Sequence, residues 1–167
     1  MIINTLSNVK FEIRTEDQVL AGSIIYSDIG FSEAALLLDE EFALRLISPG
    51  VWVTGYSATK QEKLIATIKA ETGGVLSVRK LNRRRKYIFK KSTNWKSRFS
   101  LLNSSGEELL ALIPAVNWKK ESHDYILQLN EEFENECDSF LILQAVHCAN
   151  CSLSMMTGGE VPALISV

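Results

Sequence analysis

Apolar and polar residues alternate along much of the middle of the chain. The alternation is clearest in residues 62–70, 86–90, 98–101 and 125–129. A period of two residues is typical of antiparallel strands that have one buried face and one solvated face. Turn-forming residues, at 48–50, 72–74, 92–94 and 103–106, interrupt the alternation about every ten residues or more. The pattern predicts a meander of short strands that forms a barrel or a sandwich.

The segment Ser32–Ile47 supports two interpretations. Its helix-forming residues and a possible Ser N-cap favour a helix by propensity. Leu36 and Leu38, and then Phe42, Leu44 and Leu46, alternate in a way that instead indicates two strands. We slightly favour a hairpin that turns near Asp39 and Glu40.

Residues 138–156 are apolar on nearly every side, which predicts a buried helix. The acids Glu134, Glu136 and Asp138 precede this run and suit the positive end of a helix dipole. A membrane span is disfavoured, because polar residues leave the uninterrupted apolar run far short of the roughly 20 residues that a bilayer requires. These interrupting residues are Gln144, His147, Asn150, Ser152 and Ser154.

With 167 residues, 46% of them hydrophobic and 23% charged, the chain can bury a core of its own. We expect one domain over 1–167, with strands at about 8–130, a central helix at about 138–156 and a short tail at 158–167. The first residues contain neither a basic leader nor an apolar run of signal-peptide length, so we expect a cytoplasmic protein that can bind peripherally at the membrane. The three cysteines, Cys137, Cys148 and Cys151, are odd in number and are expected to be reduced.

The formal net charge is −2, from 18 basic and 20 acidic residues. Ten of the 18 basic residues lie between Arg79 and Arg98, a segment that contains no acid. Strand alternation predicts that Lys86, Lys90, Lys96 and Arg98 point outward together. Such a cluster can bind an anion or can be a solvated strand face that pairs with the acidic remainder. The candidate anion-binding or lipid-binding residues are Arg79, Arg83, Arg84, Arg85, Lys86, Lys90, Lys96 and Arg98.

The order of short strands followed by one very hydrophobic helix resembles the tubby C-terminal-like superfamily, especially its LURP-one-related, bacterial tubby-like and scramblase-like members. The segments that carry the resemblance are EKLIATIKAETGGVLSV, YIFKKSTNWKSRFSLLNSSGEELLALIPAVNW, DYILQL and FLILQAVHCAN, within residues 62–156. The resemblance implies an α+β, mainly β fold: a closed antiparallel β-barrel wrapped around a central hydrophobic C-terminal helix. It also implies a basic face that binds a phospholipid or phosphoinositide headgroup.

No catalytic motif is found for hydrolysis, phosphate binding or dinucleotide binding. Cys148 and Cys151, one helical turn apart beside His147, could supply two metal ligands, but no second pair completes a zinc site, so we interpret them as core residues and expect no metal or cofactor. Tyr87 and Phe89 are expected to point inward, which disfavours base stacking and nucleic acid. We therefore expect a non-enzymatic domain that binds an anionic lipid headgroup or an acidic protein surface. The alternative is a protein-interaction barrel with no small-molecule ligand, and the oligomeric state stays open.

Overall fold

The computed structural model describes residues 2–7, 9–27, 33–38, 43–47, 55–60, 63–71, 75–81, 85–92, 98–117, 119, 122–132 and 137–156. These residues form twelve strands and one α-helix, α1 (Ser139–Met156). The strands are β1 (Ile2–Ser7), β2 (Lys10–Arg14), β3 (Leu20–Tyr26), β4 (Glu33–Leu37), β5 (Ala43–Ile47), β6 (Gly55–Lys60), β7 (Lys63–Glu71), β8 (Val75–Lys80), β9 (Arg85–Lys91), β10 (Phe99–Leu102), β11 (Glu108–Asn117) and β12 (Ser122–Leu129).

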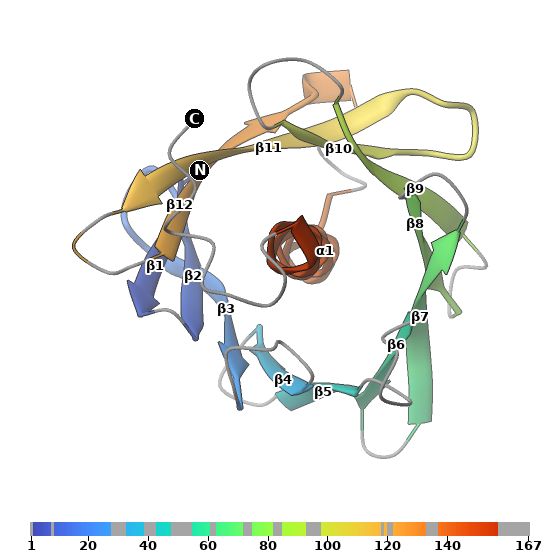
Figure 1. Cartoon of the computed structure of the whole chain (residues 1–167), viewed down its shortest axis with the longest axis horizontal. Helices are drawn as coiled ribbons and strands as arrows, with labels where there is room; N and C mark the ends of the chain where they lie inside the picture. Colours follow the sequence, from blue (N-terminus) through green and yellow to red (C-terminus); the bar gives the residue numbers. More distant parts are fainter. Residues whose placement is uncertain are drawn as a thin grey trace.

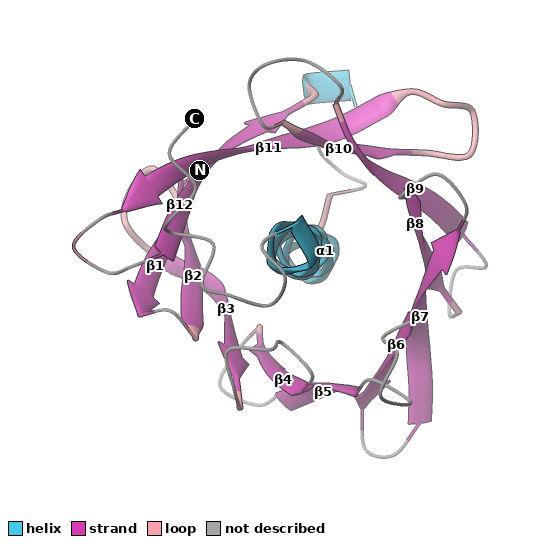
Figure 2. Cartoon of the chain, viewed as in Figure 1, coloured by secondary structure: helices cyan, strands magenta, loops and turns pink. Residues whose placement is uncertain are grey.

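The strands pair with their neighbours in chain order, and every pairing is antiparallel. Figure 1 looks along α1 and shows the strands arranged in a ring around the helix. Figure 2 shows the same arrangement by element type, with the cyan helix inside the magenta strands. We call this arrangement the strand ring.

The join between β1 and β12 corrects the predicted fold class. Main-chain pairing there is limited to Ile2 with Ile126 and Ile3 with Tyr125, although the order of strands returns to its start. Beyond Ile3 the Asp124 carboxylate accepts the Thr5 amide N–H at 2.7 Å, and the Thr5 hydroxyl donates to the carbonyl oxygen of His123. The prediction of a barrel closed by strand pairing is therefore wrong at this join, because a side chain takes the place of the main-chain partner after two residues.

The hairpin interpretation of residues 32–47 is confirmed for the strands. Glu33–Leu37 and Ala43–Ile47 pair with each other, and they also pair with β3 and β6 on their outer sides. The expected turn at Asp39 and Glu40 lies outside the described residues. Helix propensity loses here because each segment gains two hydrogen-bonded neighbours, and Ala34 and Leu36 of the first segment become buried, which an isolated helix would not provide.

The core lies between the inner face of the strand ring and α1. Alternation places Tyr87, Phe89 and Tyr125 inward, and all three are almost fully buried, as the sequence predicts. Gly22 of β3 allows close approach of the helix, since a Cβ atom there would meet the Leu143 side chain and the carbonyl oxygen of Leu37, each at 3.2 Å. The helix thus packs in contact with the wall of strands, and its residues 141–151 are buried on every side.

Candidate anion-binding face

The predicted basic residues lie partly on the outer surface of β7 to β10. Arg79 of β8 is paired in register with Lys86 of β9, so two cations stand side by side on neighbouring strands. Lys90 lies further along β9, and Lys69 of β7 lies beside Ser77 of β8. We call Lys69, Arg79, Lys86, Lys90 and Arg98 the outer basic face. Lys69 was missed by the sequence reasoning because it precedes the acid-free run along the chain.

Glu71 partly neutralises this face. Its carboxylate lies 2.9 Å from the Lys86 ammonium group. The hydrogen bond from Lys86, helped by one from Ser77, lowers the pKa of Glu71 below its ordinary value. The sequence concealed this contact, because Glu71 reaches Lys86 across β8 from a strand that precedes the basic run.

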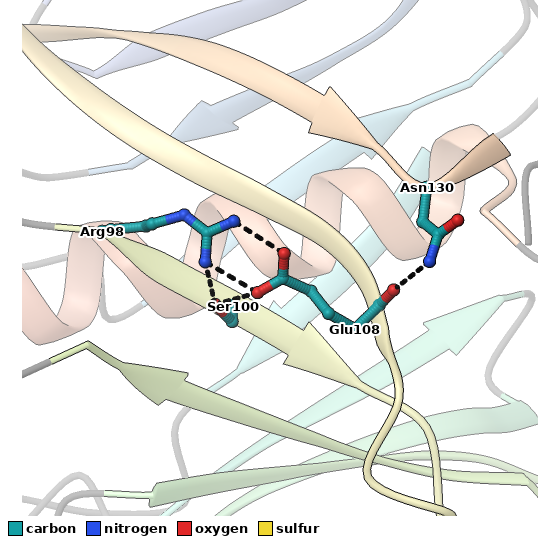
Figure 3. A network of polar contacts seen from close by, with 4 residues as sticks. All are labelled: Arg98, Ser100, Glu108 and Asn130. Atoms are coloured by element: carbon teal, nitrogen blue, oxygen red, sulfur yellow. Dashed lines mark hydrogen bonds and ion pairs between the residues drawn. The ribbon is translucent and has the colours of Figure 1, made fainter.

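A second acid, Glu108 of β11, holds Arg98. The guanidinium group donates to both carboxylate oxygens, at 2.6 and 2.7 Å, and Ser100 donates to one of them at 2.6 Å (Figure 3). This two-point contact lowers the pKa of Glu108 and raises the pKa of Arg98. Asn130 donates to the main-chain carbonyl oxygen of Glu108 at 3.0 Å and so joins the end of β12 to the same network. The geometry ties Arg98 to the sheet and removes it from the set of available cations.

Three cations of the outer basic face form no close ion pair in the described part of the chain, although the charges of Arg79 and Lys90 help to lower the pKa values of Glu71 and Glu108. Within the ranges that the structure describes, no ion-pair partner is found for Lys69, Arg79 or Lys90. Arg85, the first residue of β9, is also exposed. Of the other sequence-predicted site residues, Arg83, Arg84 and Lys96 lie outside the described residues. The structure therefore brings together Arg79, Lys86 and Lys90 on one surface, and it assigns Arg98 to an internal contact of the sheet.

Lys80, also part of the basic run, points inward instead. It is 3% exposed, and its ammonium group lies 2.7 and 2.6 Å from the two carboxylate oxygens of Asp138. Asp138 also accepts the main-chain N–H of Leu141 at 2.9 Å, which makes it the N-cap of α1. The Lys80 ammonium group lies 5.4 Å from the centre of the Phe140 ring. This lysine therefore fixes the start of the helix to β8.

A polar network crosses the middle of the core. The Tyr125 hydroxyl donates to the side-chain oxygen of Asn150 at 2.6 Å, and the Asn150 amide donates to the Tyr26 hydroxyl at 3.0 Å. His147 lies 3.2 Å from the same hydroxyl through Nδ1, and its ring stacks on Tyr26. His147 is therefore a hydrogen-bonded residue of the core.

Burial sets the protonation of this interior. Loss of solvent lowers the pKa of His147 to about 3 and raises the pKa of Cys148. Cys151 lies 3.6 Å from His147 Nε2, and all three cysteines are buried as free thiols. Because the pKa of Cys148 is raised above its ordinary value, this cysteine supplies no thiolate nucleophile near neutral pH. In the described part of the chain, no group of three or more His, Cys, Asp or Glu residues could hold a metal ion.

The Gln144 side chain lowers the stability of this interior. It is fully buried, and among the described residues neither its amide nitrogen nor its amide oxygen has a hydrogen-bond partner. A buried amide without partners costs free energy that a leucine of similar size would not. The polarity of Gln144 is visible in the sequence, but its lack of hydrogen-bond partners among the described residues is a property of the tertiary structure.

A scan of protein-family models, a search of curated proteins and a search of solved structures each found no match to this chain. The resemblance to the tubby C-terminal-like superfamily therefore stays a prediction. In the described part of the chain, no helix combines the length and the apolar character needed to cross a membrane.

Proposed function

We propose that the outer basic face binds an anionic partner, and that this partner is the headgroup layer of an anionic phospholipid membrane. The observation that carries the proposal is a set of exposed cations on three adjacent strands that have no ion-pair partner among the described residues: Lys69 on β7, Arg79 on β8 and Lys90 on β9. Like charges on neighbouring strands repel each other in the free protein. An anionic surface would relieve this repulsion and would gain about 1 kcal/mol for each cation close to it.

The ion pairs on the same face favour a second candidate. Lys86 is paired with Glu71 and Arg98 with Glu108, as expected of a solvated strand face in a protein-interaction domain without a small-molecule ligand. Exposed pairs of this kind contribute little to stability. The two candidates differ in one requirement. Anion binding needs the charges of Lys69, Arg79 and Lys90, whereas the protein-interaction candidate does not.

Co-sedimentation with vesicles tests the proposal. The vesicles contain phosphatidylcholine alone, or phosphatidylcholine with phosphatidylserine or with a phosphoinositide, at low and at physiological salt. We expect the wild type to bind the anionic vesicles. An Arg79/Lys90→Gln variant should bind them about 30-fold more weakly, which corresponds to about 2 kcal/mol for two cations.

The matched control is Lys10/Lys119→Gln, which removes the same charge from β2 and from the β11–β12 connection. It should bind within about twofold of the wild type, apart from the small effect of net charge. Equal losses in the two variants would show that net charge alone attracts the protein. Absence of wild-type binding to every anionic vesicle would refute the membrane proposal and favour the protein-interaction candidate.

A further inference from the structure

Several strand connections lie at the end of the strand ring where α1 begins. Lys80, the last residue of β8, contacts Asp138 at the start of the helix, so this end can be identified. Because successive strands are antiparallel, the β6–β7 and β8–β9 connections both lie at this end. Of the outer basic face, Arg79 and Lys86 lie nearest this end, whereas Lys69, Lys90 and Arg98 lie toward the other end of the same strands.

Two leucines at these connections are exposed to solvent. Leu64 is 47% exposed and Leu81 is 43% exposed. They lie on neighbouring strands, since the main-chain N–H of Leu81 donates to the carbonyl oxygen of Ile65 at 2.8 Å. We call Leu64 and Leu81 the rim leucines.

The rim leucines adjoin exposed cations. Leu81 directly follows the last residue of β8, and exposed Arg79 lies two residues before it in that strand. Lys63, exposed, precedes Leu64 directly, and exposed Arg85 begins the next strand. The rim leucines therefore form a small exposed apolar surface at this end of the strand ring, with basic residues beside it.

A second pair of exposed apolar residues at the same end has acids as well as a cation beside it. Val19, in the β2–β3 connection, is 62% exposed, and Leu20, the first residue of β3, is 51% exposed; Glu16 and Asp17 precede them in the connection, and Arg14 is paired in register with Leu20. Anionic lipid would repel those acids. Single exposed apolar residues are common on protein surfaces, so exposure alone does not indicate a membrane-binding residue. The charges of the neighbouring residues distinguish the rim leucines from Val19 and Leu20.

We infer that the rim leucines insert into the interfacial layer of an anionic membrane while the surrounding cations contact the headgroups. The inference rests on the proposed function and specifies its partner and its orientation. A bilayer offers anionic groups at its surface and an apolar layer beneath them, so a protein corner with both characters matches it. A polyanion in solution or an acidic protein would use the cations and would gain little from the leucines.

The first test compares a Leu64/Leu81→Gln variant with a Val19/Leu20→Gln variant in the vesicle assay. Both remove two exposed apolar side chains from the same end of the strand ring. We expect the Leu64/Leu81 variant to bind anionic vesicles about tenfold more weakly than the wild type, and the Val19/Leu20 variant to bind like the wild type. The loss should persist at high salt, because burial of apolar surface is not screened.

Heparin, a polyanion without an apolar layer, separates the possible failures. If the wild type binds neither vesicles nor heparin, the proposed function and this inference both fail. If the Arg79/Lys90→Gln variant loses vesicle binding and the Leu64/Leu81→Gln variant does not, the proposed function stands and the inference is overturned. If the Leu64/Leu81→Gln variant loses binding to vesicles and to heparin equally, the leucines affect the structure of the outer basic face, and the inference is also overturned. If the Leu64/Leu81→Gln variant loses vesicle binding and retains heparin binding, the inference is supported.

A fluorescent probe gives a second measurement that does not depend on weakened binding. The native cysteines are buried, so a Leu81→Cys variant can be labelled at that position in the folded protein with an environment-sensitive fluorophore. Emission should shift to the blue on addition of anionic vesicles and should not shift with heparin. A label on Val19→Cys should not respond. An unchanged Leu81 probe on vesicles that bind the protein would refute insertion.

Discussion

Replacing Asp138 with asparagine tests whether the buried ammonium group of Lys80 depends on one carboxylate. The substitution keeps the shape of the side chain and an oxygen that can still cap the main-chain N–H of Leu141, but it removes the negative charge. Lys80→Met removes the other partner and leaves the carboxylate. The two changes break the same ion pair from opposite ends.

The expected costs differ because the two partners differ in exposure. The Lys80 side chain is 4% exposed, whereas the Asp138 side chain is 46% exposed. Asp138→Asn leaves a buried cation with a weaker acceptor and should lower the free energy of unfolding by about 2 kcal/mol, the contribution typical of a hydrogen bond to a charged group. Lys80→Met leaves a carboxylate that water can solvate, and it should cost about 1 kcal/mol or less. Asp138→Ala should cost about 1 kcal/mol more than Asp138→Asn, because the helix also loses its N-cap.

Urea denaturation of the wild type, the two single variants and the Lys80→Met/Asp138→Asn double variant completes the cycle. The double variant should be as stable as Lys80→Met, since no buried charge is left without a partner, and the coupling energy should be about 2 kcal/mol. In thermal unfolding, Asp138→Asn should lower Tm by about 6 °C for a chain of this size. The reasoning is refuted if Lys80→Met costs as much as Asp138→Asn, or if the double variant shows the sum of both losses.

Three further predictions follow from the interior and from the join of β1 with β12. Gln144→Leu should raise the free energy of unfolding by about 1–2 kcal/mol, because it removes a buried amide without partners; a lower Tm would contradict this. His147 has a pKa lowered from 6.5 to about 3 by burial, so an unfolded chain binds a proton that the folded chain does not, and stability should fall as pH decreases from about 6.5 toward 3. Urea titrations between pH 6.5 and 4.5 should show a slope that is smaller in His147→Gln by up to about 1.4 kcal/mol per pH unit. His123, whose pKa burial also lowers, and the carboxylates whose pKa values ion pairing lowers contribute to the slope that remains; equal slopes would exclude His147 as a source. Asp124→Ala removes the acceptor of the Thr5 amide and should cost about 1–3 kcal/mol, with faster hydrogen exchange at Thr5; unchanged protection there would show that the carboxylate does not hold the join.

The local pattern of the chain determined the elements. Alternation around Tyr87 and Tyr125 identified strands and their buried faces, because in a strand every second side chain points to the same side. The run of apolar residues over 138–156 identified the helix, because a helix that is apolar on all sides needs apolar surroundings on all sides. The turn at 103–106 was also readable: the N–H of Gly106 bonds to the carbonyl oxygen of Asn103 at 3.1 Å, and its φ of 86° suits glycine.

Only the tertiary structure decided which charges are available. Lys80, Lys86 and Arg98 look alike along the chain, yet one is buried against Asp138 and two are paired with acids from other strands. Their partners lie 58, 15 and 10 residues away along the chain, and strand register, which the sequence pattern does not specify, brings them together. The join at Thr5 was hidden for the same reason, since Asp124 reaches it from 119 residues away. Periodicity depends on neighbours in sequence and can be seen in one chain, whereas pairing of charges depends on neighbours in space.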